Sequence, residues 1–349
     1  MTRAATPADV IAGAARYAVA HGDWRAAHAQ IPDGIAQTCV TSPPYYGLRD
    51  YGCDGQIGLE QTPAEYVAQI VAVMREVRRV LRDDGTAWLN LGDSYNSGSS
   101  GGLGGSTITG GQTNQRASNR HGRGMVDGLK PKDLLGIPWR VAFALQDDGW
   151  WLRSDIVWSK PNPMPESVTD RPTRAHEYVF LLTKSSRYFY DREPIREQPK
   201  PSNGGLCRAP PAHESNIAAG VGYVQRETRY AEIKGANART VWTIGPEPYA
   251  GAHFATMPPE LARRCILAGS RKGDVVLDPF GGSGTTALVA VGHGRRALLC
   301  ELNPAYAALQ RERLAEVDAD FGRPVRAPSA PPSSDPRQLS LLSQLMESA

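Results

Sequence analysis

The stretch at residues 275–286, VVLDPFGGSGTT, constrains the fold of this chain more than any other. Its apolar start predicts a buried strand, and its glycines predict a tight turn that lets a ligand approach the backbone. The threonines that follow predict the first turn of a helix, whose free N–H groups favour an anionic ligand. A strand, a turn and a helix in this order are typical of an α/β fold whose ligand lies at the carboxyl ends of the strands.

A second buried strand is predicted at residues 297–300, and it ends at Glu301, whose carboxylate can accept hydrogen bonds from a ribose. Gly282, Gly284 and Ala287 also match the dinucleotide fingerprint, with Glu301 on the order of 20 residues further on. An NAD-dependent oxidoreductase is therefore a rival hypothesis, although its fingerprint is expected early in a domain and not after residue 275. A phosphate-binding loop is excluded, because no Gly-Lys-Ser/Thr follows the glycines.

The other informative stretch is the turn at residues 41–45, TSPPY, which follows a short apolar run at 35–40. Two consecutive prolines cannot donate hydrogen bonds to a sheet, so the predicted strand ends here. The turn carries the hydroxyl of Ser42, the carbonyl of Pro43 and the ring of Tyr45. Together they can hold a planar amino group and cover the flat face beside it. An ordinary proline-rich turn with a buried tyrosine is the simpler interpretation.

Taken together, the two stretches resemble the β-class amino-group DNA methyltransferases, because residues 41–45 precede the glycine turn. The resemblance covers roughly residues 20–315. It implies a Rossmann-like α/β fold with a mostly parallel seven-stranded sheet, a circularly rearranged motif order and a small recognition module. It also implies S-adenosyl-L-methionine as cofactor and double-stranded DNA as partner. In that family, a serine in the motif at residues 41–45 accompanies cytosine N4 methylation more often than adenine N6 methylation. Adenine N6 methylation remains the alternative.

The resemblance assigns site residues by position. The expected catalytic residues are Ser42, Pro43, Pro44 and Tyr45. The expected cofactor-binding residues are Asp23, Thr41, His253, Phe254, Asp278, Phe280, Gly282, Gly284, Thr285, Thr286 and Glu301. Asp23 is the candidate acceptor for the adenine amino group, and it is an equally good helix N-cap. A ring facing the target base is expected from Trp158 or Pro161, and His176 is expected to be structural. The chemistry requires no metal.

Five segments are predicted along the chain. Residues 1–14 form an N-terminal extension, and residues 15–191 form the catalytic half, with a Gly/Ser-rich insertion at 96–124. Residues 192–250 form the target-recognition region, 251–320 the cofactor-binding half, and 321–349 a disordered tail. The insertion carries three arginines and is either a loop that closes on DNA phosphates or an idle linker. A DNA-binding protein without catalysis is a third hypothesis for the whole chain.

Several further elements are predicted from local patterns. A helix is expected to start at Thr62 with a capping box and to end at Asp84-Gly85. Another helix is expected from the stretch at 134–145, started by Pro138 and stopped near Asp148-Gly149. Strands are expected over 16–20, 86–91, 151–158, 176–183 and 241–244. A hairpin strand is predicted at 187–191. Further helices are expected over 24–31, from Pro258 or Pro259 to about Ala268, and over 306–314.

Composition narrows the class of protein. The 349 residues are 41% hydrophobic, and no apolar run approaches 18 residues, so neither a membrane span nor a secretory signal is expected. The five cysteines are scattered without CxxC spacing, which argues against a disulfide framework or a zinc site. A cytoplasmic protein is expected. The net charge of +3 is weak evidence for nucleic acid. A homodimer and a cognate restriction endonuclease are possible partners.

Overall fold

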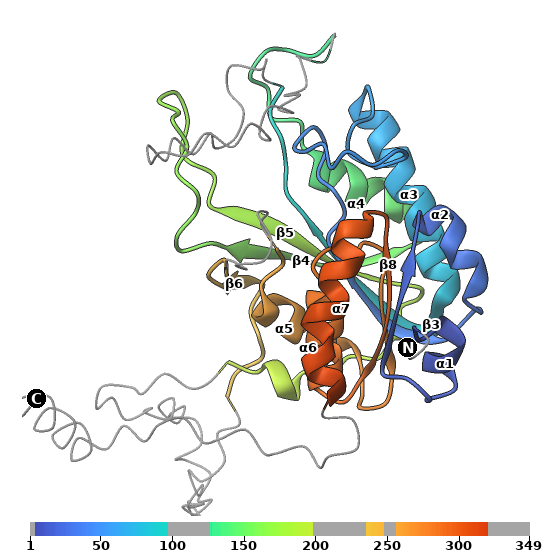
Figure 1. The fold of residues 1–349 in the computed structure, drawn as a ribbon. Coiled ribbons are helices and arrows are strands. Elements are labelled where there is room, and N and C mark those ends of the chain that lie inside the picture. Colours follow the sequence, from blue (N-terminus) through green and yellow to red (C-terminus); the bar gives the residue numbers. More distant parts are fainter. Residues whose placement is uncertain (1–3, 97–125, 127, 198–234, 248–255, 320–349) are drawn as a thin grey trace, which may run out of the picture.

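The computed structural model describes residues 4–96, 126, 128–197, 235–247 and 256–319 (Figure 1). Most of the predicted insertion at 96–124 lies outside these residues, as does the predicted tail at 321–349. Of the predicted recognition region at 192–250, only 192–197 and 235–247 are described. No helix in the described part of the chain is long and apolar enough to cross a membrane.

One eight-stranded sheet organises the described residues, in the order β1-β8-β7-β2-β3-β5-β4-β6. All neighbouring pairs are parallel except those that β5 makes with β3 and β4, so β5 alone runs in the opposite direction. The strands are β1 (Tyr17–His21), β2 (Ala36–Thr41), β3 (Leu81–Leu91), β4 (Trp151–Ser159), β5 (His176–Thr183), β6 (Val241–Thr243), β7 (Val275–Asp278) and β8 (Arg296–Glu301). The predicted α/β fold with a mostly parallel sheet is confirmed, with one strand more than expected.

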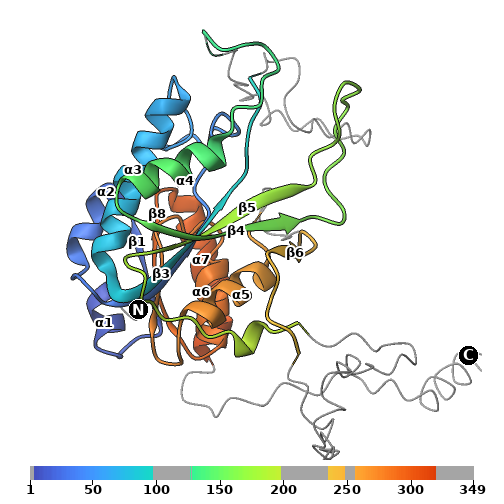
Figure 2. The same ribbon diagram turned by 180° about the vertical axis from the view of Figure 1, so that it is seen from behind.

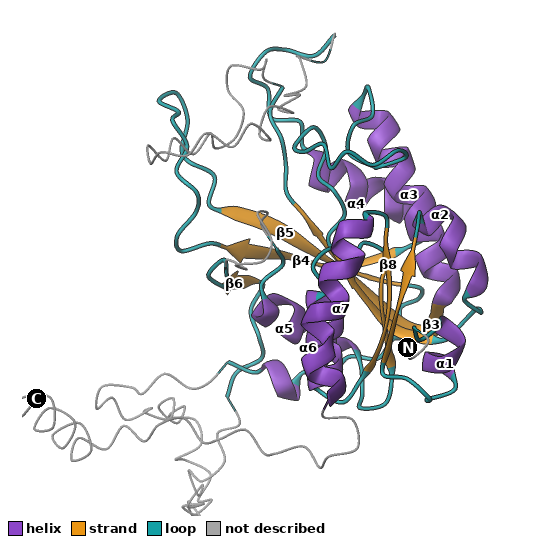
Figure 3. Ribbon diagram, viewed as in Figure 1, coloured by secondary structure: helices purple, strands orange, loops and turns teal. Residues whose placement is uncertain are grey.

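Helices cover both faces of the sheet (Figures 2 and 3). One face carries α1 (Pro7–Ile11), α2 (Trp24–Ala27), α3 (Pro63–Val80) and α4 (Ile137–Asp147). The other carries α5 (Pro259–Gly269), α6 (Thr285–Gly292) and α7 (Pro304–Ala319). Because side chains alternate along a strand, Cys39 packs in the first layer and Val40 in the second. Because both faces are covered, β2 and β7 are buried along their whole length.

The longest helix, α3, forms where the sequence predicts it. Thr62 accepts a hydrogen bond from the Glu65 N–H at 3.2 Å, and Glu65 accepts one from the Thr62 N–H at 3.1 Å. Its buried stripe packs on the sheet, and Arg79 near its end donates to the carbonyls of His28 and Ile31. The helix ends at Val80 and not at Asp84-Gly85, because Leu81 already pairs with Ala36 of β2.

Three other local predictions need correction. Residues 187–191 form no strand: the Phe189 N–H donates to the Asp84 carbonyl and the Asp191 N–H to the Ala268 carbonyl, so this segment follows the edge of the domain as a loop. Helix α4 runs from Ile137 to Asp147, so its predicted start at Pro138 and stop near Asp148-Gly149 are confirmed, but residues 134–136 lie outside it because Gly136 takes the left-handed conformation at the N-cap. The helix that starts at Trp24 is α-helical to Ala27 and continues as a 3₁₀ turn to Gln30.

Two chain segments far apart in sequence meet in the middle of the sheet. Strand β2, which leads into the predicted catalytic turn, pairs directly with β7, which leads into the glycine turn. The carboxyl ends of β2, β7 and β8 therefore lie at one edge. Because β5 is reversed, its amino end reaches this same edge.

Candidate active site

A cavity of about 860 Å³ opens at the carboxyl edge of the sheet. It is within the size range of small-molecule and cofactor sites. Eleven of the residues predicted from the sequence line it: Asp23, Ser42, Pro43, Pro44, Tyr45, Asp278, Phe280, Gly282, Thr285, Thr286 and Glu301. The structure thus brings the two predicted motifs together around one space.

Four of the fifteen predicted catalytic and cofactor-binding residues are not placed in this lining. Thr41 is buried beneath the cavity, and its hydroxyl donates to Asp278 Oδ1 at 2.7 Å. Gly284 is the left-handed N-cap of α6, and a Cβ there would approach Gln310 Cγ to 3.1 Å. Both residues therefore support the glycine turn without lining the cavity. His253 and Phe254 lie outside the described residues.

Asp278 organises the glycine turn. Its carboxylate accepts from the Thr41 hydroxyl, from the Thr286 hydroxyl at 2.6 Å and from the Phe280 N–H at 3.0 Å. Burial raises the pKa of Asp278 to about 6, while these three hydrogen bonds act in the opposite direction. The Thr286 hydroxyl is therefore committed to Asp278, which leaves backbone groups at the start of α6 for an anionic ligand.

Glu301 lies on the opposite side of the same turn. Its Oε2 accepts from the Gly282 N–H at 2.6 Å and its Oε1 from the Asn303 N–H at 2.8 Å. Burial raises the pKa of Glu301 to about 7. The carboxylate retains lone pairs toward the cavity, which is the requirement for binding the two hydroxyls of a ribose.

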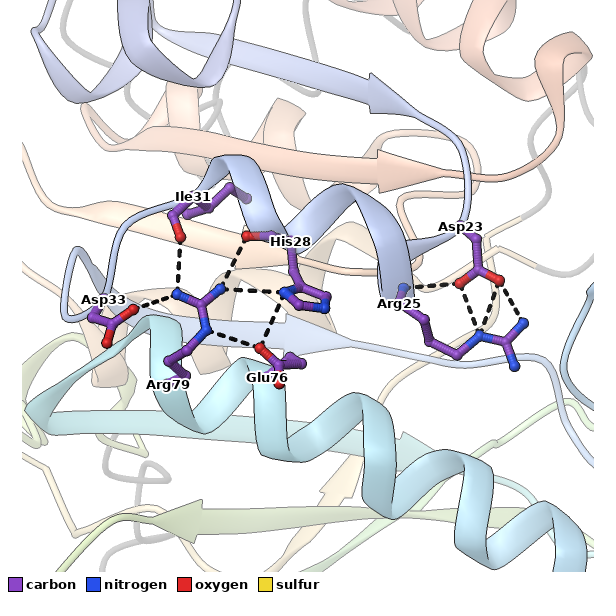
Figure 4. Close-up of polar contacts among 7 residues, drawn as sticks. All are labelled: Asp23, Arg25, His28, Ile31, Asp33, Glu76 and Arg79. Carbon is purple, nitrogen blue, oxygen red and sulfur yellow. Dashed lines mark hydrogen bonds and ion pairs between the residues drawn. The ribbon is translucent and has the colours of Figure 1, made fainter.

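Asp23 is held as a helix cap (Figure 4). Its Oδ1 accepts from the Arg25 N–H at 2.8 Å, and the carboxylate also pairs with the Arg25 guanidinium. Arg25 in turn donates to the Gly55 carbonyl at 2.7 Å. The capping role is confirmed, and the side chain lines the cavity as well, so the two predicted roles are compatible.

The predicted catalytic turn is held to neighbouring elements by hydrogen bonds of Tyr45 and Pro44. The Pro44 carbonyl accepts from the Tyr66 hydroxyl at 2.9 Å. The Tyr45 hydroxyl donates to Glu177 Oε2 at 2.5 Å, and burial raises its pKa well above the ordinary tyrosine value. No hydrogen bond to the Pro43 carbonyl comes from the part of the chain that the structure describes. Pro43 and Ser42 both border the cavity, as an amino-group acceptor pair requires.

Trp158 lines the cavity, whereas Pro161 does not. The indole N–H donates to the Ile244 carbonyl at 2.8 Å, and the Lys160 ammonium lies 4.5 Å from the ring centroid. His176 lies at the start of β5 with its ring edge-on to Tyr178, and it lines the cavity too. No group of three or more His, Cys, Asp or Glu residues suited to a metal ion occurs among the described residues.

Sequence reasoning missed the polar residues behind Tyr45, namely Asn90, Lys160 and Glu177. The available signal was a charged residue at the amino end of an otherwise apolar strand, 176–183. It also missed Arg313 of α7, which donates to the Thr285 hydroxyl and to the Ser283 carbonyl. Only the tertiary structure brings these residues to the site.

Comparison with known proteins agrees with this geometry. The model of the DNA methylase family that comprises N6 and N4 methyltransferases matches residues 36–312. The Type II methyltransferase M.XycI of Xanthomonas campestris pv. cyanopsidis is 48% identical over 293 residues, covering 84% of this chain and 86% of its own. M.SmaI of Serratia marcescens is 47% identical over 300 residues, covering 84% and 89%. The chain therefore belongs to the N6/N4 DNA methylase family, among the Type II DNA methyltransferases.

Solved structures agree on the fold. A protein from Thermus thermophilus described as a putative DNA modification methylase, in complex with S-adenosyl-L-methionine, is 25% identical with a TM-score of 0.51. The alignment covers 86% of this chain and 93% of that one. The cytosine-N4-specific PvuII DNA methyltransferase has a TM-score of 0.56 at 19% identity, covering 88% and 93%.

Proposed function

We propose that this enzyme transfers a methyl group from S-adenosyl-L-methionine to the exocyclic N4 amino group of cytosine in double-stranded DNA. One observation carries the proposal: Ser42 and Pro43 border the same cavity as the glycine turn and Glu301. An acceptor pair for an amino group and a site for a nucleoside cofactor thus share one space. Neither an NAD-dependent oxidoreductase nor a DNA-binding protein without catalysis requires an amino-group acceptor pair beside a cofactor site.

The residues around the cavity fit S-adenosyl-L-methionine, the cofactor used by the family. Glu301 would hold the ribose hydroxyls, the start of α6 would hold the carboxylate, and Asp23, which lines the cavity, would accept from the adenine amino group. When bound, the cofactor supplies an electrophilic methyl group on a sulfonium. The methionine end would also meet residues 253–254, which lie outside the described residues.

The target base must leave the duplex to reach this cavity, at a cost of a few kcal/mol. Stacking on the ring of Tyr45 would offset part of that cost, since base–aromatic stacking is worth about 1–3 kcal/mol. Ser42 Oγ and the Pro43 carbonyl would accept hydrogen bonds from the amino group and localise the lone pair on its nitrogen. The acceleration then comes from holding nucleophile and methyl in line and from fixed acceptors that stabilise the cationic amine.

The choice of cytosine over adenine rests on Ser42. In this family, the enzymes that methylate adenine more commonly carry an aspartate at this position. Ser42 is smaller than aspartate and uncharged. Adenine N6 is the alternative target, because the same acceptors would bind either amino group. We assign recognition of the DNA sequence to residues 192–250. A second copy of this chain and a cognate restriction endonuclease are further proposed partners.

The experiment is nucleoside mass spectrometry on genomic DNA incubated with the enzyme and methyl-labelled cofactor. The DNA comes from a strain without this activity, so it offers many candidate sites, and the Ser42→Ala variant serves as the control. The expected product is labelled N4-methylcytosine. If the label appeared in N6-methyladenine, the target would be adenine and not cytosine. If neither base carried label on its amino group, the proposal would be overturned.

A further inference from the structure

Four polar side chains form a connected cluster behind the catalytic turn: Tyr45, Asn90, Lys160 and Glu177. Glu177 Oε2 lies 2.5 Å from the Tyr45 hydroxyl and 3.0 Å from Asn90 Nδ2. Glu177 Oε1 forms an ion pair with Lys160. The side chains of this pair are only 13% and 22% exposed, so the cluster lies mostly out of solvent. A buried ion pair costs desolvation and is weak evidence of a stabilising role.

The reversed strand β5 places this carboxylate. Glu177 is the second residue of β5 and pairs with Trp158 of β4, while Leu91 at the end of β3 pairs with the next residue, Tyr178. The amino end of β5 therefore lies beside the carboxyl ends of β3 and β4. Were β5 parallel like its neighbours, its amino end would lie at the opposite edge of the sheet.

The chemistry of the partners fixes the direction of each hydrogen bond. An ionised carboxylate has only acceptor sites, so the Tyr45 hydroxyl must donate its single proton to Glu177. The oxygen of Tyr45 then has only lone pairs to offer. It accepts from Asn90 Nδ2 at 2.8 Å and from the Ser42 hydroxyl at 3.3 Å.

This direction decides how Ser42 faces the cavity. A serine hydroxyl can donate or accept, and an unrestrained one would do either. Here its proton points to Tyr45, and Asn90 takes one of its two lone pairs, so the other is available to a donor in the cavity. Asn90 Nδ2 donates to the same Ser42 oxygen at 3.4 Å, and because it is a donor it gives the serine proton no alternative acceptor. An aspartate at position 42 would be an acceptor without any such help.

We infer that Glu177 is a positioning residue that, through the Tyr45 hydroxyl, fixes Ser42 as the hydrogen-bond acceptor for the target amino group. The inference rests on the proposed function, because only an amino-group substrate requires Ser42 to accept. It assigns Lys160 the task of holding the far oxygen of the carboxylate. It also explains why a serine serves in this turn where related enzymes carry a carboxylate.

The test is a double-mutant cycle on single-turnover methyl transfer with Glu177→Gln, Tyr45→Phe and the double variant. Glu177→Gln keeps the shape but removes the charge, and we expect its rate to fall about tenfold or more. Because Glu177 acts through the Tyr45 hydroxyl, the double variant should be no slower than the slower single variant, within about twofold. The dissociation constant for S-adenosyl-L-methionine should stay within about twofold in all three.

Two further measurements separate this role from a merely structural one. Glu260→Gln removes another paired carboxylate, on α5 beside Arg263 and Arg264, and should leave the rate unchanged. In proton NMR, the strongly hydrogen-bonded Tyr45 hydroxyl should give a low-field resonance. That resonance should be absent in Tyr45→Phe and move to higher field in Glu177→Gln.

A methyl-transfer rate near wild type in Glu177→Gln would overturn the inference. So would a double variant whose rate loss equals the product of the two single-variant losses. If cofactor affinity fell together with the rate, Glu177 would merely maintain the structure of the site, and the inference would be wrong. A wild-type enzyme that labels no amino group would refute the proposed function, and the inference with it. An active wild type whose Tyr45 resonance does not respond to Glu177→Gln would overturn the inference alone.

Discussion

Gly92 lies directly against the ring of Tyr45, and its replacement by alanine tests how firmly that ring must be held. A Cβ on Gly92 would approach Tyr45 Cε2 to 2.6 Å and Cδ2 to 2.8 Å. Gly92 is not among the residues with positive φ, so alanine meets no backbone strain there. The whole effect of Gly92→Ala is therefore the contact with Tyr45.

The ring has little freedom to yield. The Tyr45 hydroxyl is hydrogen-bonded to Glu177 and Asn90. If the ring moved away from Gly92, it would break a hydrogen bond to a charged group, which is worth about 1.5–3 kcal/mol. Staying in place would overpack the site at a cost of about 1–3 kcal/mol. Each 1.36 kcal/mol lost from the transition state is tenfold in rate, so we expect methyl transfer to slow by about 10- to 100-fold.

The assay is single-turnover methyl transfer, with cofactor affinity measured by calorimetry on the same preparations. Gly292→Ala is the matched control, because a Cβ at Gly292 at the end of α6 meets nothing within 4 Å. Gly92→Ala should lose rate while keeping cofactor affinity, and Gly292→Ala should keep both. If Gly92→Ala turned over at the wild-type rate, the ring would not be held as the structure indicates.

Three further predictions address other parts of the site. Ser42→Ala should lower turnover by about 10²-fold or more with nearly unchanged cofactor affinity, because it removes an acceptor fixed on the reacting nitrogen; near wild-type turnover would refute its role. Burial raises the pKa of Glu301 from 4.5 to about 7, so the folded protein holds a proton that the unfolded chain has released. The stability from that proton is complete below about pH 4.5 and is lost as pH rises through about 7. The melting temperature of Glu301→Gln relative to wild type should therefore rise across this window in calorimetry, and a constant difference would contradict the shift. In urea unfolding, Asp23→Ala should cost about 1 kcal/mol and Asp23→Asn much less, since asparagine keeps the cap; equal losses would show that the cap does not matter.

The parts of the fold that were predictable have strong local signals. The capping box at Thr62, the glycine turn at 281–284 and the buried strands at 275–278 and 296–301 follow from spacing and residue type alone. Boundaries failed where tertiary pairing overrides the local signal. Asp84-Gly85 has the composition of a helix end, yet it lies inside β3, because Leu81 is already paired with β2.

The site was predictable only as far as its motifs extend. Ser42 and Asp278 belong to contiguous patterns, and parallel strand order brings them together. Glu177 and Asn90 carry no pattern, because their role depends on the reversal of β5 and on a contact between residues 45 and 177. Thr41 was predicted at the cofactor, and the structure adds a contact that the sequence does not signal: its hydroxyl donates to Asp278.

The most direct test of the account locates the transferred methyl group on its acceptor atom. Uniformly ¹⁵N-labelled DNA from a strain without this activity is incubated with the enzyme and cofactor carrying a ¹³C methyl group. The modified nucleosides are then separated and examined by NMR. The account predicts a one-bond coupling between the ¹³C methyl carbon and the exocyclic amino ¹⁵N of a methylated deoxycytidine, which places the methyl on N4. A ¹³C methyl group bonded to a ring carbon, without that coupling, would contradict it.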